Sequence, residues 1–157
     1  MLRSKILYMR LVIGRSLSGT TWAPAHIAWG DNNRTTVARV VAGRLEFRLC
    51  DGSSNIYLAI ASTIAAILDG VEQGMIPPAP LDEDIYEWDE DKFTANNIQT
   101  LPQTLGEALV ALKADGTLVQ AMGMDFVKEY IDTKTPEWID YCRSVSDWEY
   151  ARYLRTL

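Results

Sequence analysis

Residues 44–49 alternate strictly between polar and apolar side chains, and this alternation constrains the fold more than any other feature of the chain. The run is Arg44-Leu45-Glu46-Phe47-Arg48-Leu49. Successive side chains of a β-strand point to opposite faces, so two arginines and one carboxylate share one face while three apolar side chains share the other. The pattern predicts a half-buried strand with a cationic face.

Residues 35–41 form a second candidate strand, and residues 42–43 (Ala-Gly) connect the two. The pair predicts a β-hairpin with a two-residue turn. In this register Arg39 faces Glu46 at roughly 5 Å and joins the polar face, with Arg34 near the open end of the hairpin. The other facing pairs are Val41 with Arg44 and Val37 with Arg48.

Two interpretations of this arginine cluster are open. A solvated sheet face with cross-strand ion pairs, each worth about 0.5 kcal/mol, is the common case for a hairpin. The density of arginines favours a site for a polyanion and a metal ion, because guanidinium groups bind phosphate bidentately and do not titrate. A carboxylate among them can bind a divalent ion that bridges phosphate oxygens.

The composition limits the possible partners and compartments. The 157 residues carry a net charge of −6, which argues against general nucleic-acid binding. The two cysteines, Cys50 and Cys142, fit neither a metal spacing nor a disulfide framework, so we expect free thiols in the cytoplasm. The longest apolar run, residues 56–68, is too short to span a membrane, so we expect no membrane partner.

The rest of the chain predicts helices. Capping residues at 51–55 precede a helix over 55–73, whose lack of a polar face predicts burial on nearly all sides. Prolines at 77, 78 and 80 stop it, and we expect residues 81–99 to form a solvated acidic loop. Capping boxes begin helices at Thr104 and Ser146. The four helices expected after residue 100 cover 104–115, 123–132, 136–145 and 146–156.

The predicted fold class is therefore α+β. It comprises an antiparallel half-sheet with its hairpin at about 35–50, a buried helix and a C-terminal helical subdomain. The expected divisions are residues 1–75, 76–100 and 101–157. His26 is the single histidine, and no glycine-rich phosphate loop or marked nucleophile is present.

Several segments together resemble the C-terminal part of the glutamine synthetase catalytic domain. Residues 51–58 are similar to the family's D-P-x-x-N-P-Y-L signature, with Gly52 and Ile56 where prolines usually stand. Leu101-Pro102, Leu105, Glu107 and Ala108 resemble the family's L-P-x-x-L-x-E-A-L element. The other matching segments are Tyr8-Met9-Arg10-Leu11, Trp22-Ala23-Pro24, Asn33-Arg34-Thr35, Arg39, Arg44-Leu45-Glu46-Phe47-Arg48, Ser146-Asp147-Trp148-Glu149 and Arg152-Tyr153-Leu154.

The resemblance implies an ATP-dependent ligase. ATP would phosphorylate the side-chain carboxylate of glutamate, and ammonia would displace phosphate, with methylamine or another amine as the alternative donor. Glu46 would bind Mg²⁺ or Mn²⁺. The resemblance further implies phosphate and catalytic roles for Arg34 and Arg39, ATP binding by Arg44, and glutamate binding by Arg10 and Arg48. It also implies a cytoplasmic homo-oligomer in nitrogen metabolism.

The chain departs from the family pattern in two ways. Trp22 stands where ammonia-using members carry a glutamate before Ala-Pro, which suits a bulkier amine, although type III-like members share the tryptophan. Tyr86 aligns with a tyrosine that enteric members adenylylate, and we do not extend that modification to this chain.

The N-terminal β-grasp domain and further metal ligands are not matched, so we expect the chain to be inactive alone. A non-catalytic fragment that docks on a complete synthetase is the rival interpretation.

Overall fold

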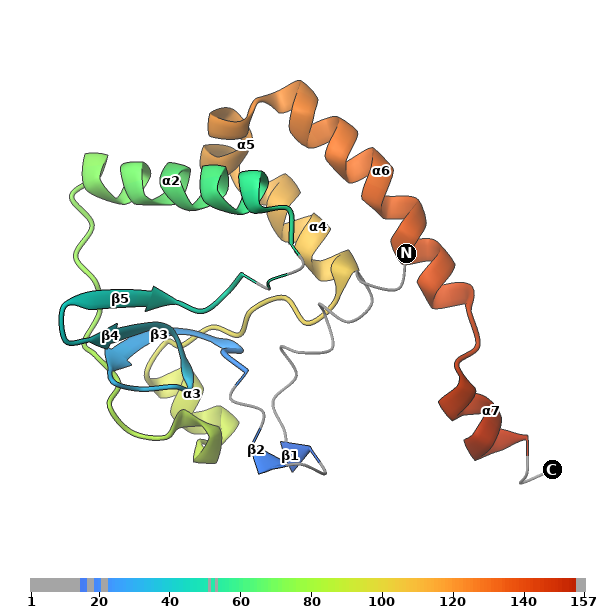
Figure 1. Cartoon of the computed structure of the whole chain (residues 1–157), viewed down its shortest axis with the longest axis horizontal. Helices are drawn as coiled ribbons and strands as arrows, with labels where there is room; N and C mark the ends of the chain where they lie inside the picture. Colours follow the sequence, from blue (N-terminus) through green and yellow to red (C-terminus); the bar gives the residue numbers. More distant parts are fainter. Residues whose placement is uncertain (1–14, 17–18, 21–22, 51, 53, 155–157) are drawn as a thin grey trace. The chain divides into compact units, whose positions relative to one another are not determined.

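The computed structural model describes residues 15–16, 19–20, 23–50, 52 and 54–154 (Figure 1). The chain divides into two compact units, residues 1–104 and 105–157. The first unit holds all the described strands, and from residue 105 onward the described elements are helices. The expected α+β class is confirmed.

A three-stranded sheet organises the first unit in the order β3–β4–β5. Its strands are β3 (His26–Asp31), β4 (Thr36–Val41) and β5 (Arg44–Phe47). Strands β4 and β5 are antiparallel with Arg39 opposite Glu46 and Val41 opposite Arg44, so the predicted hairpin and its register are confirmed. Gly43 takes φ +79° in the turn, a conformation that favours glycine. Two-residue strands β1 (Arg15–Ser16) and β2 (Gly19–Thr20) form a separate antiparallel pair.

The sheet is mixed, however, because β3 runs parallel to β4. Parallel neighbours usually need a long crossover, whereas residues 32–35 make this connection alone. Asn32 takes φ +50°, and the buried side chain of Asn33 accepts hydrogen bonds from the Thr35 amide (2.9 Å) and hydroxyl (2.6 Å). The residues at 31–33 are typical of a turn, and the strand that follows them runs parallel to β3. The expectation of an antiparallel sheet was wrong for this pair of strands.

The acidic stretch after residue 80 packs against the sheet instead of forming a solvated loop. It contains a 3₁₀ turn, η1 (Ile85–Glu87), and a short helix, α3 (Glu90–Ala95). The Leu81 amide donates to the Trp29 carbonyl at 2.8 Å, and Ile85 is fully buried. A Cβ on Gly30 would lie 1.9 Å from the Leu81 carbonyl oxygen, so glycine permits this close approach. The backbone hydrogen bond of Leu81 and the buried side chain of Ile85 attach the segment to the sheet, while its acidic side chains stay largely exposed.

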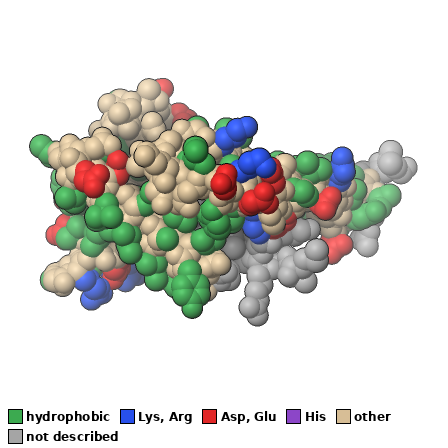
Figure 2. All heavy atoms as spheres, turned by 90° about the horizontal axis from the view of Figure 1, so that it is seen from above, with side chains coloured by type: hydrophobic (Ala, Val, Ile, Leu, Met, Phe, Trp, Pro, Cys, Tyr) green, Lys and Arg blue, Asp and Glu red, His purple; other side chains and the backbone are tan. Residues whose placement is uncertain are grey.

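Helix α2 (Ile56–Glu72) forms where the sequence predicts it. Asn55 caps it, and its side chain accepts from the Tyr57 amide (3.1 Å) and the Leu58 amide (3.3 Å). The prediction that this helix is buried was wrong, because none of its residues is buried and the Ile64 side chain is half exposed. Hydrophobic side chains lie at the surface in the view of Figure 2. An apolar helix is expected to pack against other apolar surface. The described part of the first unit leaves the side chains of α2 without such cover.

The second unit consists of helices α4 (Leu105–Ala114), α5 (Gly116–Met122), α6 (Met124–Arg143) and α7 (Asp147–Tyr153). Its buried residues are Leu105 and Leu109 of α4 and Val127 of α6. A Cβ on Gly106 would lie 2.5 Å from the indole nitrogen of Trp138, so α4 and α6 approach closely there.

Two sequence predictions for this unit have opposite outcomes. Helix α6 continues through Pro136, so the expected break between residues 132 and 136 was wrong. Proline removes one backbone donor, yet the helix runs from Met124 to Arg143 without ending at it. The capping box of Ser146 and Glu149 is confirmed at the start of α7.

Among the described helices, none combines the length and hydropathy required to cross a membrane.

Candidate functional site

Glu46 of β5 and Arg39 of β4 form the centre of the candidate site. Because they face each other across the hairpin, Arg39 Nη1 lies 2.9 Å from Glu46 Oε2. The Arg39 side chain is only 14% exposed, and its Nη2 also donates to Asn32 Oδ1. Strand register and two acceptors therefore fix the position of this guanidinium group.

Arg44 binds the other oxygen of the same carboxylate. Its Nε and Nη2 donate to Glu46 Oε1 at 3.0 and 2.8 Å, in a two-atom contact along the strand. Hydrogen bonds from Arg44 and then Arg39 lower the pKa of Glu46 below its ordinary value. The Arg44 side chain is 64% exposed, so much of its charge still faces solvent.

Arg48 follows β5 and turns its guanidinium group toward backbone oxygens. Its Nη1 donates to the carbonyls of Arg34 and Thr36, the latter at 3.2 Å. Burial lowers the pKa of Arg48, and the opposing charges of Tyr86 and Glu46 raise it in part. Arg34 itself is exposed. The structure therefore brings Arg39 and Arg44 together on Glu46, as the strand register predicted, and Arg48 contacts the backbone of Arg34.

Three polar residues that the sequence analysis did not assign to the site support this region. Asn32 fixes Arg39, and Asn33 donates to the carbonyls of Leu81 (2.6 Å) and Glu83 (2.8 Å). Tyr86 donates its hydroxyl to the Ala23 carbonyl, and burial raises its pKa to about 12. The Asn32-Asn33 pair is a turn signal, but the contacts of Asn33 with the Leu81 and Glu83 carbonyls lie about fifty residues away and no local pattern predicts them.

The residues described here do not by themselves fit a metal site. No group of three or more histidine, cysteine, aspartate or glutamate side chains is placed to bind an ion within the described ranges. Both Glu46 oxygens accept hydrogen bonds from arginines, and cations disfavour a second cation beside them. Binding of Mg²⁺ or Mn²⁺ by Glu46 therefore stays a prediction that requires ligands from outside these residues.

Two residues with expected roles lie outside the described residues. These are Arg10, assigned to glutamate, and Trp22, the residue before Ala-Pro. His26 is described, and it is only 3% exposed and stacked on Phe93 at 4.0 Å between ring centroids. It is a core residue of the sheet.

Comparison with known proteins identifies the family. Residues 8–153 match the family model described as glutamine synthetase, catalytic domain. A glutamate–methylamine ligase of Methyloversatilis universalis is 49% identical over 147 residues, which are 94% of this chain and 33% of the relative. A glutamine synthetase of Halobacterium salinarum is 43% identical over 152 residues, which are 94% of this chain and 32% of the relative.

Solved structures agree with these matches. A structure titled as a GmaS/ADP complex aligns with a TM-score of 0.76 and 34% identity over 98% of this chain and 38% of that chain. A second, titled as GmaS without ligand, aligns with a TM-score of 0.70 and 33% identity over 98% of this chain and 36% of that chain. The chain thus spans about a third of the length of the curated relatives it matches. From the sequence match, the described hairpin and the structural alignments together, the chain belongs to the glutamine synthetase family.

Proposed function

We propose that this chain provides the arginine-rich part of an active site that joins an amine to the side-chain carboxylate of glutamate at the expense of ATP. The ion-pair network of Arg39, Glu46 and Arg44 carries this proposal. It presents fixed guanidinium groups on one face of a hairpin in a chain of the glutamine synthetase family. Guanidinium groups suit the phosphate and carboxylate groups of both substrates.

The reaction proceeds in two displacements. A carboxylate oxygen of glutamate attacks the terminal phosphorus of ATP, the bond to the bridging oxygen breaks, and ADP leaves. The nitrogen of the amine then attacks the carbon of the resulting acyl phosphate, phosphate leaves, and the nitrogen loses a proton. Both steps join or separate anionic groups, so positioning and charge stabilisation dominate catalysis.

Each arginine has a role that its surroundings support. Arg34 and Arg44 are exposed and can bind phosphate oxygens of ATP, and Arg44 keeps its free hydrogen-bonding edge while it binds Glu46. Arg39 is oriented by Glu46 and Asn32, which holds one guanidinium group still for the transferred phosphoryl group. Arg48 is fixed by two carbonyls and, with Arg10, is assigned to the carboxylates of glutamate.

The nitrogen donor that we favour is methylamine. The methylamine ligase relative is 49% identical, whereas the glutamine synthetases of Halobacterium salinarum and Thermotoga maritima are 43% and 37% identical. Trp22 in place of the family's glutamate also suits a bulkier amine than ammonia. Ammonia is the second candidate, because tryptophan at this position does not distinguish the donors within the type III-like branch.

A non-catalytic docking fragment is a second candidate function. The exposure of α2 favours it, because Ile60, Ile64 and Ile67 present apolar surface that a partner would cover. The two candidates differ in what the partner has to supply: catalysis requires a metal-binding and substrate-binding region from outside the described residues, whereas docking requires only a surface that covers α2.

A chimera tests the catalytic proposal. The part of the Methyloversatilis relative that precedes its matched region is joined to residues 1–157, and phosphate release is measured with ATP and glutamate plus methylamine or ammonia. We expect turnover that requires both substrates and that Arg44→Ala lowers about 100-fold. Arg143→Ala, on α6, is the matched control and should leave the rate unchanged. A chimera that folds, with its two parts packed together, but shows no turnover would instead support the docking fragment.

A further inference from the structure

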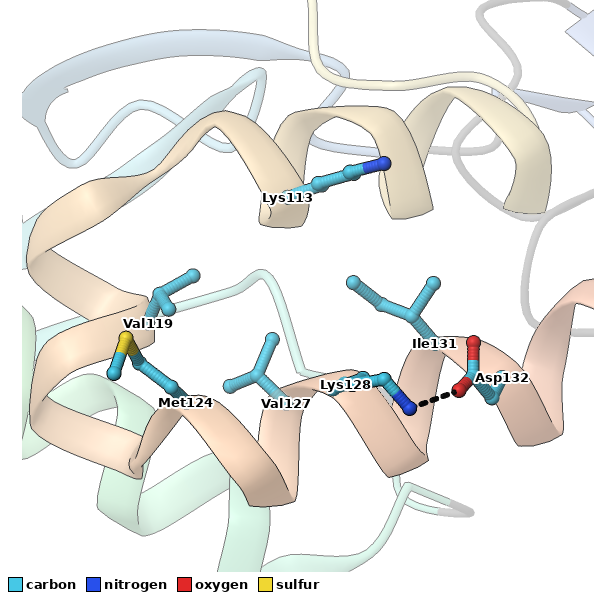
Figure 3. A pocket seen from close by; sticks show the side chains of 7 residues that line it. All are labelled: Lys113, Val119, Met124, Val127, Lys128, Ile131 and Asp132. Carbon is cyan, nitrogen blue, oxygen red and sulfur yellow. Dashed lines mark hydrogen bonds and ion pairs between the residues drawn. The ribbon is translucent and has the colours of Figure 1, made fainter.

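A cleft within the second unit is lined by side chains from α4, α5 and α6 (Figure 3). Its volume is about 360 Å³. Small-molecule pockets in proteins enclose about 300–1,000 Å³, so this cleft has room for one small ligand. None of its lining residues belongs to the arginine cluster of the hairpin.

One end of the cleft is apolar. Val119 of α5 and Met124 and Val127 of α6 form this end, and Ile131 continues the apolar wall one turn further along α6. Val127 is 4% exposed and closes the floor. Met124 is 74% exposed, so a hydrocarbon group placed here would be shielded from water on the side that faces Val127 and Ile131, which favours binding.

The other end carries charge. Lys128 and Asp132 of α6 form an ion pair of 3.0 Å between Nζ and Oδ2, so their charges offset each other. Lys113 reaches toward the cleft from α4, and within the described part of the chain its ammonium group makes no ion pair. The three charged groups therefore leave one positive charge at the mouth. The Asp132 carboxylate is already engaged by Lys128, so the charge left over at this end is the ammonium group of Lys113, which favours an anion over a cation.

We propose that this cleft binds a small amphipathic anion, namely a monocarboxylate with a short unbranched hydrocarbon chain. The carboxylate binds the ammonium group of Lys113, and the chain lies along Ile131 and Val127 toward Met124. A single unpaired cation matches a single negative charge, which distinguishes this ligand from a polyphosphate. The volume matches a short chain, which distinguishes it from an extended peptide or a membrane surface.

Methyl NMR tests this proposal on the 157-residue chain labelled with ¹³C at its methionine methyl groups. Sodium octanoate is titrated below its micellar concentration, and Met124→Leu assigns the reporting signal. Octylammonium and octan-1-ol are the matched probes with the same chain. We expect a saturable shift of the Met124 methyl group with octanoate, and weaker binding of the other two. Equal binding of all three probes, or no saturable shift with octanoate, would overturn the proposal.

Two variants locate the anion. Lys113→Gln should weaken octanoate binding about three- to fivefold, the factor that an exposed ion pair provides, and Lys113→Arg should retain binding. Lys134→Gln removes the same charge from α6 outside the cleft and is the control. Circular dichroism shows whether each variant keeps its helices. Octanoate affinity that is equal in Lys113→Gln and Lys134→Gln would contradict a role for Lys113.

Discussion

Arg39 and Glu46 lie directly opposite each other on β4 and β5, and their side chains are joined by a 2.9 Å ion pair. Arg39 is largely buried, whereas Arg44, which binds the same carboxylate, is mostly exposed. The carboxylate therefore balances a buried charge on one side and meets a solvated charge on the other. Loss of the buried contact should therefore lower the free energy of unfolding more than loss of the exposed one.

Glu46→Gln should destabilise the sheet, because it leaves the buried guanidinium group of Arg39 without its counter-ion. Arg44→Gln removes an exposed partner and should destabilise it less. Urea unfolding at pH 7 measures both. Because the pKa of Glu46 is lowered in the folded chain, its stabilising contribution is present above its ordinary pKa and is lost as the pH falls through the folded value.

The pH dependence supplies the control for this pair. Glu46→Gln should remove that part of the acid dependence, whereas Arg44→Gln should reduce it in part. Glu46→Gln removes both ion pairs and Arg44→Gln removes only the exposed one, so if the two variants unfold at the same urea concentration, the buried ion pair with Arg39 adds nothing measurable to stability.

Asn33→Ala should lower the free energy of unfolding by about 1–3 kcal/mol, because it leaves buried partners unsatisfied. Its side chain donates to the Leu81 and Glu83 carbonyls and accepts from Thr35. We expect residues 81–99 to become sensitive to limited proteolysis as well, since Asn33 attaches this stretch to the turn. Urea unfolding followed by tryptophan fluorescence and mass analysis of the fragments measures both effects.

Asn96→Ala is the matched control for Asn33. Asn96 is exposed and its side chain donates to the Lys92 carbonyl at 2.8 Å, so the same chemical change should cost less than about 0.5 kcal/mol. Equal losses in the two variants would mean that Asn33 does not attach residues 81–99 to the turn.

The hairpin shows how much of this site the sequence predicts. Strict alternation over residues 44–49 and the glycine at position 43 determine strand, register and the shared face of the charges, because strand periodicity is local. The contacts of Asn33 with Leu81 and of Tyr86 with Ala23 join residues 48 and 63 positions apart. Sequence patterns over a short stretch of residues do not reveal contacts at this separation. The packing of the acidic stretch against the sheet could therefore not be predicted.

Helix α2 shows the opposite limit. Its apolar residues correctly predict a helix. An apolar composition indicates that the helix surface should pack against other residues, but it does not show whether those residues belong to the same chain. Pro136 is similar, because the cost of one missing backbone donor is local while the continuity of α6 depends on twenty residues.

Ile64→Glu tests the exposure of α2. If the half-exposed Ile64 side chain is solvated, this change should alter the free energy of unfolding by about 0.5 kcal/mol or less and should reduce self-association of the chain. If the helix were buried, the same change would place a charge in a core and would prevent folding or cost several kcal/mol. Light scattering after size-exclusion chromatography, together with urea unfolding, separates the outcomes. Asp69→Asn on the same helix is the control.

Acid should destabilise the first unit through His26. The ring is 3% exposed, stacks on Phe93 and lies 3.4 Å from the Thr100 hydroxyl through Nδ1, and Nε2 lacks a hydrogen-bond partner among the described residues. Burial lowers the pKa of His26, and the nearby charge of Glu90 raises it in part. Protonation would add a buried charge and an unsatisfied donor.

The unfolded chain therefore binds a proton at a higher pH than the folded chain does. Stability should fall as the pH drops below the ordinary value of about 6.5 and should level off below the folded pKa. Urea unfolding between pH 8 and pH 5 measures this slope. NMR titration of the single histidine gives the folded pKa directly. His26→Phe keeps a ring against Phe93 without a titrating group and should remove the slope in this window. A folded pKa at or above 6.5 would show that the ring is solvated and would overturn the prediction.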